Sequence, residues 1–190
     1  MDSPGAPPPK QRIAPALDHA AFGNGRVLGL VSPTSAIEWL CLPRFDSPSI
    51  FARLLDAEKG GTFRFLHEGR EIAGELSYLR NTNVARIHFA RGDLAWEVID
   101  FAPRIPEGWG VQVPIQIVRL VRPLAGVPRL CVDFDPRPDY ARARAEIRLN
   151  TSGVEVLGAA APLHLVSPCS SGWRSSRRSK ASSRLGIPFV

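Results

Sequence analysis

The sequence lacks the features that mark several large classes of protein. It contains no run of eighteen apolar residues, so no segment predicts a membrane-spanning helix. The N-terminal stretch MDSPGAPPPKQR has no apolar core of the kind found in a secretory signal. We therefore expect a cytoplasmic protein that has no membrane partner.

Cysteine is scarce, with three residues at positions 41, 131 and 169. They form no C-x-x-C pair and no Cys/His cluster at zinc spacing, which predicts that the chain holds no metal. Cys41 and Cys131 lie in apolar runs that are typical of buried free thiols. An odd number of cysteines without a signal peptide favours a reducing compartment.

Motifs for nucleophilic catalysis and for phosphate binding are also missing. No serine or cysteine lies in a nucleophile-elbow context, and the four histidines are scattered along the chain. The GNG stretch at residues 23–25 lacks the remainder of a dinucleotide-binding fingerprint. The sequence thus predicts no cofactor and no catalytic residue.

Basic charge is concentrated in one segment. The chain has a net charge of +6, but residues 167–190 hold five basic residues, eight serines and no acidic residue. The preceding 166 residues are nearly neutral, which makes nucleic-acid binding through the tail a distant alternative. We predict a disordered basic tail over residues 167–190, unable to extend the fold, and interpret its Ser/Arg-rich composition as a frameshift product or, alternatively, a natural tail.

The body of the chain has the pattern of an all-β protein. Residues 1–12 are Pro-rich and predict a disordered N-terminus, whereas residues 13–166 contain nine or ten short apolar runs separated by turn residues. This spacing predicts a large antiparallel β-sandwich. Residues 48–59 predict its one short helix, with Ser47 as N-cap and Gly60-Gly61 as the end.

The stretch LPRFD places Arg44, Phe45 and Asp46 where an apolar strand ends. One interpretation is a ligand or partner contact, because an arginine fork and a carboxylate can both hydrogen-bond a polyhydroxyl group. The other is a salt-bridged turn, with Phe45 in the core and Asp46 and Ser47 capping the helix. The residues alone favour the second.

Two other groups are weaker candidates. Three carboxylates in DFDPRPDY, those of Asp133, Asp135 and Asp139, could hold a cation but lack the pattern of a calcium loop. The tryptophans could stack sugars, but Trp39 and Trp96 lie in apolar strands, so we expect both in the core and only Trp109 exposed.

Five stretches carry a resemblance to a known family. They are, in order, GNGRVLGLVSPTSAIEWLCLPRFDSPSIFARLLD, YLRNTNVARIHF, VIDFAPR, IVRLVRPLAGVPRL and PRPDY. Between residues 13 and 166 the chain resembles the N-terminal domain of bacterial glycoside hydrolase family fifteen, the glucoamylase and trehalase group. The resemblance implies a β-sandwich that precedes an (α/α)6 barrel, where one glutamate acts as general acid and another as base with inversion. None of the glutamates in this chain matches those catalytic positions.

The resemblance changes the weight given to LPRFD. It implies that Arg44, Phe45 and Asp46 lie at the end of the sandwich that faces the barrel, where they support a substrate pocket or an interdomain contact. Residues Arg80, Asn81 and Thr82 of YLRNTN are expected on the same surface. We therefore expect a truncated, non-catalytic fragment that is inactive alone, whose partner is the missing barrel and whose candidate ligands are α-glucosides. The alternative is a stand-alone module that binds carbohydrate or a separate catalytic chain.

Overall fold

The computed structural model describes residues 18–142, 145–151, 153–159 and 161–167, together with the backbone of residues 173–176 and 180–186. Within these residues every regular element is a β-strand, and every strand pairing is antiparallel. No described segment is a long apolar helix of the kind that crosses a membrane. The prediction of an all-β fold is confirmed, and the prediction for residues 1–12 lies outside the described residues.

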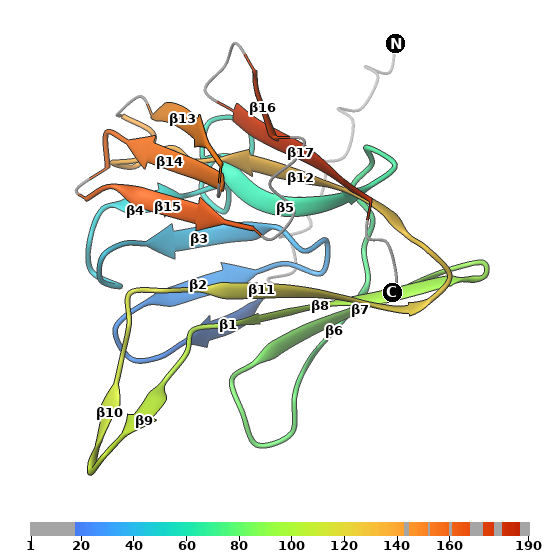
Figure 1. Ribbon diagram of the computed structural model, residues 1–190, viewed down its shortest axis with the longest axis horizontal. Coiled ribbons are helices and arrows are strands. Elements are labelled where there is room, and N and C mark those ends of the chain that lie inside the picture. The colour runs from blue at the N-terminus through green and yellow to red at the C-terminus, as the bar shows by residue number, and fades with distance from the viewer. Residues whose placement is uncertain are drawn as a thin grey trace, which may run out of the picture.

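The largest sheet, sheet A, has eight strands in the order β1-β2-β3-β5-β12-β17-β16, with β4 paired to β3 (Figure 1). Its members are β1 (Ala20–Gly23), β2 (Leu28–Val31), β3 (Ile37–Cys41), β4 (Ser49–Phe51), β5 (Thr62–His67), β12 (Arg129–Asp135), β16 (Trp173–Ser176) and β17 (Lys180–Gly186).

Three smaller sheets complete the fold. Sheet B has the order β11-β8-β7-β6, a two-stranded sheet C pairs β9 with β10, and sheet D has the order β13-β14-β15. Their members are β6 (Glu75–Tyr78), β7 (Ala85–Arg91), β8 (Leu94–Phe101), β9 (Ile105–Glu107), β10 (Gly110–Gln112), β11 (Val118–Ala125), β13 (Glu146–Asn150), β14 (Gly153–Leu157) and β15 (Leu163–Val166).

Sheets A and B face each other across one apolar core. In strands such as β7 and β12 alternate residues enter it, as a half-buried sheet requires. The His67 ring of β5 stacks on the Trp96 indole of β8 with centroids 5.0 Å apart, and Phe89 of β7 stacks on the same indole at 5.1 Å. Trp96 is buried, as predicted. Val154 and Val156 bring sheet D into the same core.

A buried arginine connects the two facing sheets. Arg119 of β11 and Asp100 of β8 are cross-strand partners, and the Arg119 Nε lies 2.8 Å from the Asp100 Oδ1. The guanidinium also donates to the backbone carbonyls of Phe63 and Ser35, each at 2.6 Å. It lies over the rings of both Phe63 and Phe65, 4.6 and 4.9 Å from their centroids. Arg119 thus reaches from sheet B to sheet A.

The predicted helix over residues 48–59 is wrong. Ser49, Ile50 and Phe51 are all buried in β4, which pairs with β3, and turns follow up to Gly60. Strand β3 pairs with β5 only at Ile37, so the rest of that side offers backbone partners to residues 49–51, and burial of three successive side chains is not possible on one helical face. The Asp56 side chain accepts from the amides of Glu58 and Lys59 in the turn that replaces the helix.

Trp39 was predicted to lie in the core, and this prediction is wrong. The pairing of β2 with β3 shifts register between Leu30 and Val31, because Leu30 is opposite Trp39 whereas Val31 is opposite Ile37. Such a bulge inserts an extra residue and redirects the side chains that follow it. Trp39 is only half-buried, and Leu30 opposite it is half-buried too.

The C-terminal segment differs from the prediction in part. Strand β17 pairs with β12 over residues 129–134 and 181–186, and β16 pairs with β17. The expectation that residues 167–190 add nothing to the sheet is therefore wrong for these two strands. The other residues after 167 lie outside the described part of the chain, and the origin of the tail stays a prediction.

Candidate functional site

Several loops gather at one end of the sandwich, and the turn between β1 and β2 joins two of them. The amide of Phe45, in the loop after β3, donates to the Arg26 carbonyl at 3.1 Å. The Asn83 side chain, in the loop between β6 and β7, donates to the Gly23 carbonyl at 2.7 Å. We call this surface the loop end; it comprises residues 23–27, 42–48, 79–84 and 102–117.

Arg44 and Asp46 form the salt-bridged turn that the residues predict. The Nε and Nη2 atoms of Arg44 donate to the two carboxylate oxygens of Asp46, at 2.9 and 3.1 Å. The hydroxyl of Ser47 accepts from the Arg44 amide at 3.2 Å. These bonds hold the pair in a fixed orientation although both side chains are more than half exposed.

The charges of this turn act on two neighbouring groups. The hydrogen bond from Arg44 holds the pKa of the Asp46 carboxyl below its usual range. Burial raises the pKa of the Cys41 thiol, and the Asp46 charge raises it further. Asp46 therefore remains ionised at neutral pH, whereas Cys41 remains a buried, protonated thiol that is unsuited to nucleophilic chemistry.

Phe45 departs from the simpler interpretation of LPRFD. Its side chain is 54% exposed and lies between the two charged residues of the turn, not in the core. Phenylalanine is among the residue types that are most often fully buried. The turn thus presents an apolar ring together with an arginine-carboxylate pair.

Arg80, Asn81 and Thr82 form an exposed turn between β6 and β7. The Thr82 hydroxyl donates to the Leu79 carbonyl at 2.8 Å and accepts from the Val84 amide at 3.1 Å, so it serves the turn itself. Asn81 has a positive φ of 59°, which asparagine tolerates better than most residues. The structure places this turn on the same end as LPRFD, with the turn between β1 and β2 contacting both.

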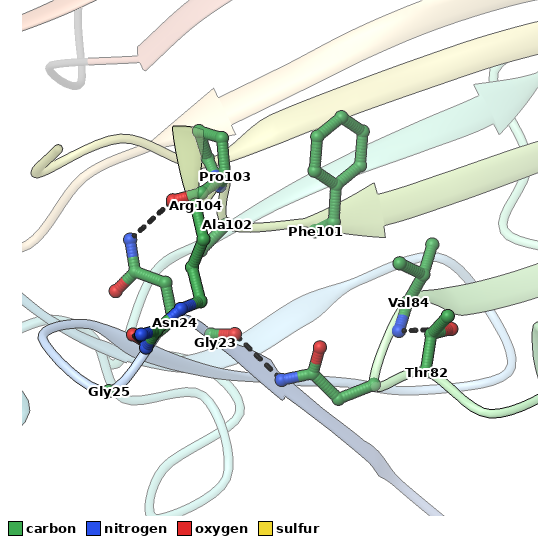
Figure 2. A pocket seen from close by; sticks show the side chains of 10 residues that line it. Gly23, Asn24, Gly25, Thr82, Val84, Phe101, Ala102, Pro103 and Arg104 are labelled. Carbon is green, nitrogen blue, oxygen red and sulfur yellow. Dashed lines mark hydrogen bonds between the residues drawn. The ribbon is translucent and has the colours of Figure 1, made fainter. Parts of the chain in front are cut away.

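An open groove of about 530 Å³ lies between the β1–β2 turn, the β6–β7 turn and the segment at the end of β8 (Figure 2). It is lined by Gly23, Asn24, Gly25, Thr82, Asn83, Val84, Phe101, Ala102, Pro103 and Arg104. This lining contains no carboxylate, histidine or cysteine. The groove therefore lacks the paired acids that glycoside hydrolysis requires.

Asn24 is the structural centre of the loop end, and sequence reasoning missed it. Its Nδ2 donates to the carbonyls of Pro103 at 3.1 Å and Pro114 at 2.9 Å, the first of which appears in Figure 2. Its Oδ1 accepts from the amides of Arg26 and Val27. The available signal was an asparagine between two glycines, which is typical of a turn stabilised by its own side chain.

The two carbonyls that Asn24 holds lie on either side of the β9–β10 hairpin. This hairpin pairs only with itself and extends from the body of the molecule (Figure 1). All six of its strand residues are exposed, and Trp109 at its tip is fully exposed, as predicted. A buried asparagine thus fixes the base of an arm whose tip is apolar.

The three carboxylates of DFDPRPDY do not converge on one point. Asp133 pairs with Arg64, Asp135 with Arg137, and Asp139 with Arg142. No cluster of three metal-ligating side chains occurs among the described residues. Each carboxylate has its own arginine, so the three do not form one shared site.

Fold and loops together define a β-sandwich domain that presents one end of exposed loops. Residues 11–182 match the family described as trehalase-like, N-terminal. The chain therefore belongs to the trehalase-like N-terminal domain family.

Curated relatives agree with this assignment. The chain is 29% identical to a trehalase of Thermoplasma volcanium over 137 residues, which is 71% of this chain and 22% of that protein. It is 31% identical to a trehalase of Thermoplasma acidophilum over 121 residues (63% and 20%) and 27% identical to a trehalase of Mycobacterium tuberculosis over 154 residues (73% and 22%). The match thus spans about a fifth of these relatives. No solved structure is significantly similar to the chain.

Proposed function

We propose that this chain is the non-catalytic N-terminal domain of an inverting α-glycoside hydrolase of the trehalase and glucoamylase group, acting in the cytoplasm on α-glucosides. In such a protein the domain supports an (α/α)6 catalytic barrel. Family membership and the share of the relatives that is matched favour this role. The lining of the groove is consistent with it, because it contains no carboxylate and no histidine.

The observation that carries the proposal is the exposed apolar surface of the loop end. Phe45, Trp109 and Val111 are all about half exposed or more. Isolated two-stranded hairpins are only marginally stable in water, so an arm with an exposed tryptophan gains little within this chain alone. A contact between domains covers roughly 600–1,500 Å², and such a contact would cover these side chains.

The Arg44–Asp46 pair gives the contact its polar component. Both groups are already oriented by two hydrogen bonds, so little side-chain entropy remains to be lost when a partner docks. The Nη1 group of Arg44 is left for a carbonyl or carboxylate of the barrel. Arg80 and Asn81 extend the same surface.

A second candidate is a stand-alone module that binds carbohydrate or a separate catalytic chain. The half-exposed rings of Trp39 and Tyr140 favour the carbohydrate version. Nucleic-acid binding through the basic tail is the more distant alternative.

The test is glucose release from trehalose by two proteins. One is this chain alone, and the other is a fusion of this chain to the region that follows the matching segment in the Thermoplasma acidophilum trehalase. We expect no activity from the chain and clear activity from the fusion, above that of the following region alone. Activity in the isolated chain would refute a non-catalytic role. A fusion no more active than the following region would refute a supporting one.

A further inference from the structure

Two aromatic rings meet outside the core, away from the groove. Trp39 lies on β3 and is half-buried, whereas Tyr140 lies in the loop after β12 and is 44% exposed. Their ring centroids are 6.4 Å apart and their planes are tilted by 42°. The two rings are thus neighbours, and each keeps part of its surface in solvent.

An unusual backbone holds Tyr140 in this position. Asp139, Tyr140 and Ala141 have successive positive φ values of 53°, 54° and 64°. Left-handed backbone is disfavoured for L-residues and is seldom adopted by a bulky residue, let alone by three residues in a row. Backbone strain of this kind persists where the surroundings impose it, and it concentrates at functional sites.

The surroundings that impose the turn belong to sheet A. The amide of Arg137 donates to the Ile50 carbonyl at 2.8 Å, and the amide of Tyr140 donates to the Ser49 carbonyl at 3.4 Å. Within the turn, the Ala141 amide donates to the Arg137 carbonyl at 3.2 Å. The turn is therefore attached to β4, the neighbour of the strand that carries Trp39.

Charged groups lie beside the exposed ring. The Arg142 Nη2 is 2.9 Å from the Asp139 Oδ1, and the guanidinium carbon lies 5.6 Å from the centroid of the Tyr140 ring. Both charged side chains are largely exposed. A sugar ring needs this combination, because its C–H face packs on an aromatic ring while its hydroxyls require donors and acceptors.

We propose that Trp39, Tyr140, Asp139 and Arg142 form a binding site for the pyranose ring of a glucoside, separate from any catalytic centre. The ring packs against Tyr140 and Trp39, and its hydroxyls bond to Asp139 and Arg142. The choice of glucose units rests on the proposed function, whereas the stacking geometry does not. Such a site would hold substrate or product at the surface of the N-terminal domain.

The test follows the indole N–H signals of the isolated 190-residue chain by NMR while trehalose or maltose is added. The four tryptophan signals are assigned with single Trp-to-Phe variants. We expect the Trp39 signal to shift saturably, with a Kd of about 1–10 mM, and the Trp109 signal to stay in place. Sorbitol, which carries hydroxyls but no ring, should have no effect.

Variants separate stacking from general effects. Tyr140→Ala should weaken binding by about tenfold or more, and Tyr140→Phe should retain it within about threefold, because only the first removes the ring. Arg142→Met should weaken binding several-fold and provides a second readout if Tyr140→Ala does not fold. The matched control, Trp109→Ala, should bind as the unaltered chain does.

Three results would overturn the proposal. They are a Trp39 signal that does not move with either sugar, signals of Trp39 and Trp109 that move alike, and a folded Tyr140→Ala chain that binds with unchanged affinity. Sugar binding is measured on the isolated chain. An absence of binding would therefore leave the activity of the fusion protein as an independent test of the supporting role.

Discussion

Replacing Asp100 by asparagine tests the buried contact between the two sheets. The side chains of Arg119 and Asp100 are 3% and 0% exposed, so the substitution leaves a buried guanidinium without its counter-charge. Breaking a buried ion pair by removing one partner destabilises a protein by about 3–5 kcal/mol. Two carbonyl acceptors of Arg119 remain in this variant, which places the expected loss near the lower limit, at about 3 kcal/mol.

Replacing Arg119 by methionine should destabilise the fold more. It leaves the Asp100 carboxylate unpaired and also removes the donor to the carbonyls of Phe63 and Ser35. Each buried carbonyl without a donor adds about 1–3 kcal/mol, so the total loss should exceed that of Asp100→Asn. The expected order of stability is unaltered chain, then Asp100→Asn, then Arg119→Met.

The assay is urea unfolding followed by circular dichroism, with thermal unfolding as a second measure. A loss of about 3 kcal/mol corresponds to a decrease in Tm of roughly 6–12 °C for a chain of this size. Arg148→Met is the matched control, because its ion pair with Glu146 is exposed and should contribute less than about 1 kcal/mol. An Asp100→Asn chain that is as stable as the control, or an Arg119→Met chain that is more stable than Asp100→Asn, would refute the reasoning.

Three further predictions concern single groups. Gly61→Ala should destabilise the chain by about 2 kcal/mol or more in urea unfolding. The φ angle of Gly61 is +69°, and the new Cβ would lie 2.2 Å from the Asp135 carbonyl oxygen. Unchanged stability would contradict this prediction. The pKa of the Asp46 carboxyl, followed by ¹³C NMR, should lie below 3.8 and should return toward that value in Arg44→Ala. The stabilising contribution of this carboxylate is therefore present at neutral pH and is lost as the pH falls through the folded pKa. A pKa unaffected by Arg44→Ala would show that another group lowers it. Cys41 should react with a thiol reagent far more slowly in the folded chain than in urea, because burial raises its pKa and blocks access; equal rates would show that the β3 end opens readily.

The sequence predicted those parts of the fold that depend on local pattern. Strands such as β8 and β12 follow from short apolar runs that turn residues separate.

The errors arise where long-range contacts decide the structure. A helix at residues 48–59 is locally plausible, but pairing with β3 is available only once the chain has folded back. The position of Trp39 depends on a bulge that leaves no mark in the pattern of β3 alone. Strand β17 was missed because its polar, serine-rich sequence lacks apolar alternation, although β12 supplies its backbone partners.

Only part of the candidate site was predicted, because some of its contacts are local and others are long-range. The Arg44–Asp46 pair follows from residues two apart in one turn, so local reasoning was enough. The role of Asn24 could not be predicted, because its two acceptors, Pro103 and Pro114, lie about eighty and ninety residues away in the sequence. The functional assignment of Arg44, Phe45, Asp46, Arg80, Asn81 and Thr82 stays a prediction.

The central claim, that the loop end faces a catalytic domain, is tested most directly by amide hydrogen exchange on the fusion protein and on the isolated chain. The account predicts that residues 42–48 and the β9–β10 hairpin exchange much more slowly in the fusion, while the turn at residues 91–93 at the opposite end exchanges equally in both. Slower exchange at residues 91–93 with no change at the loop end would contradict the account.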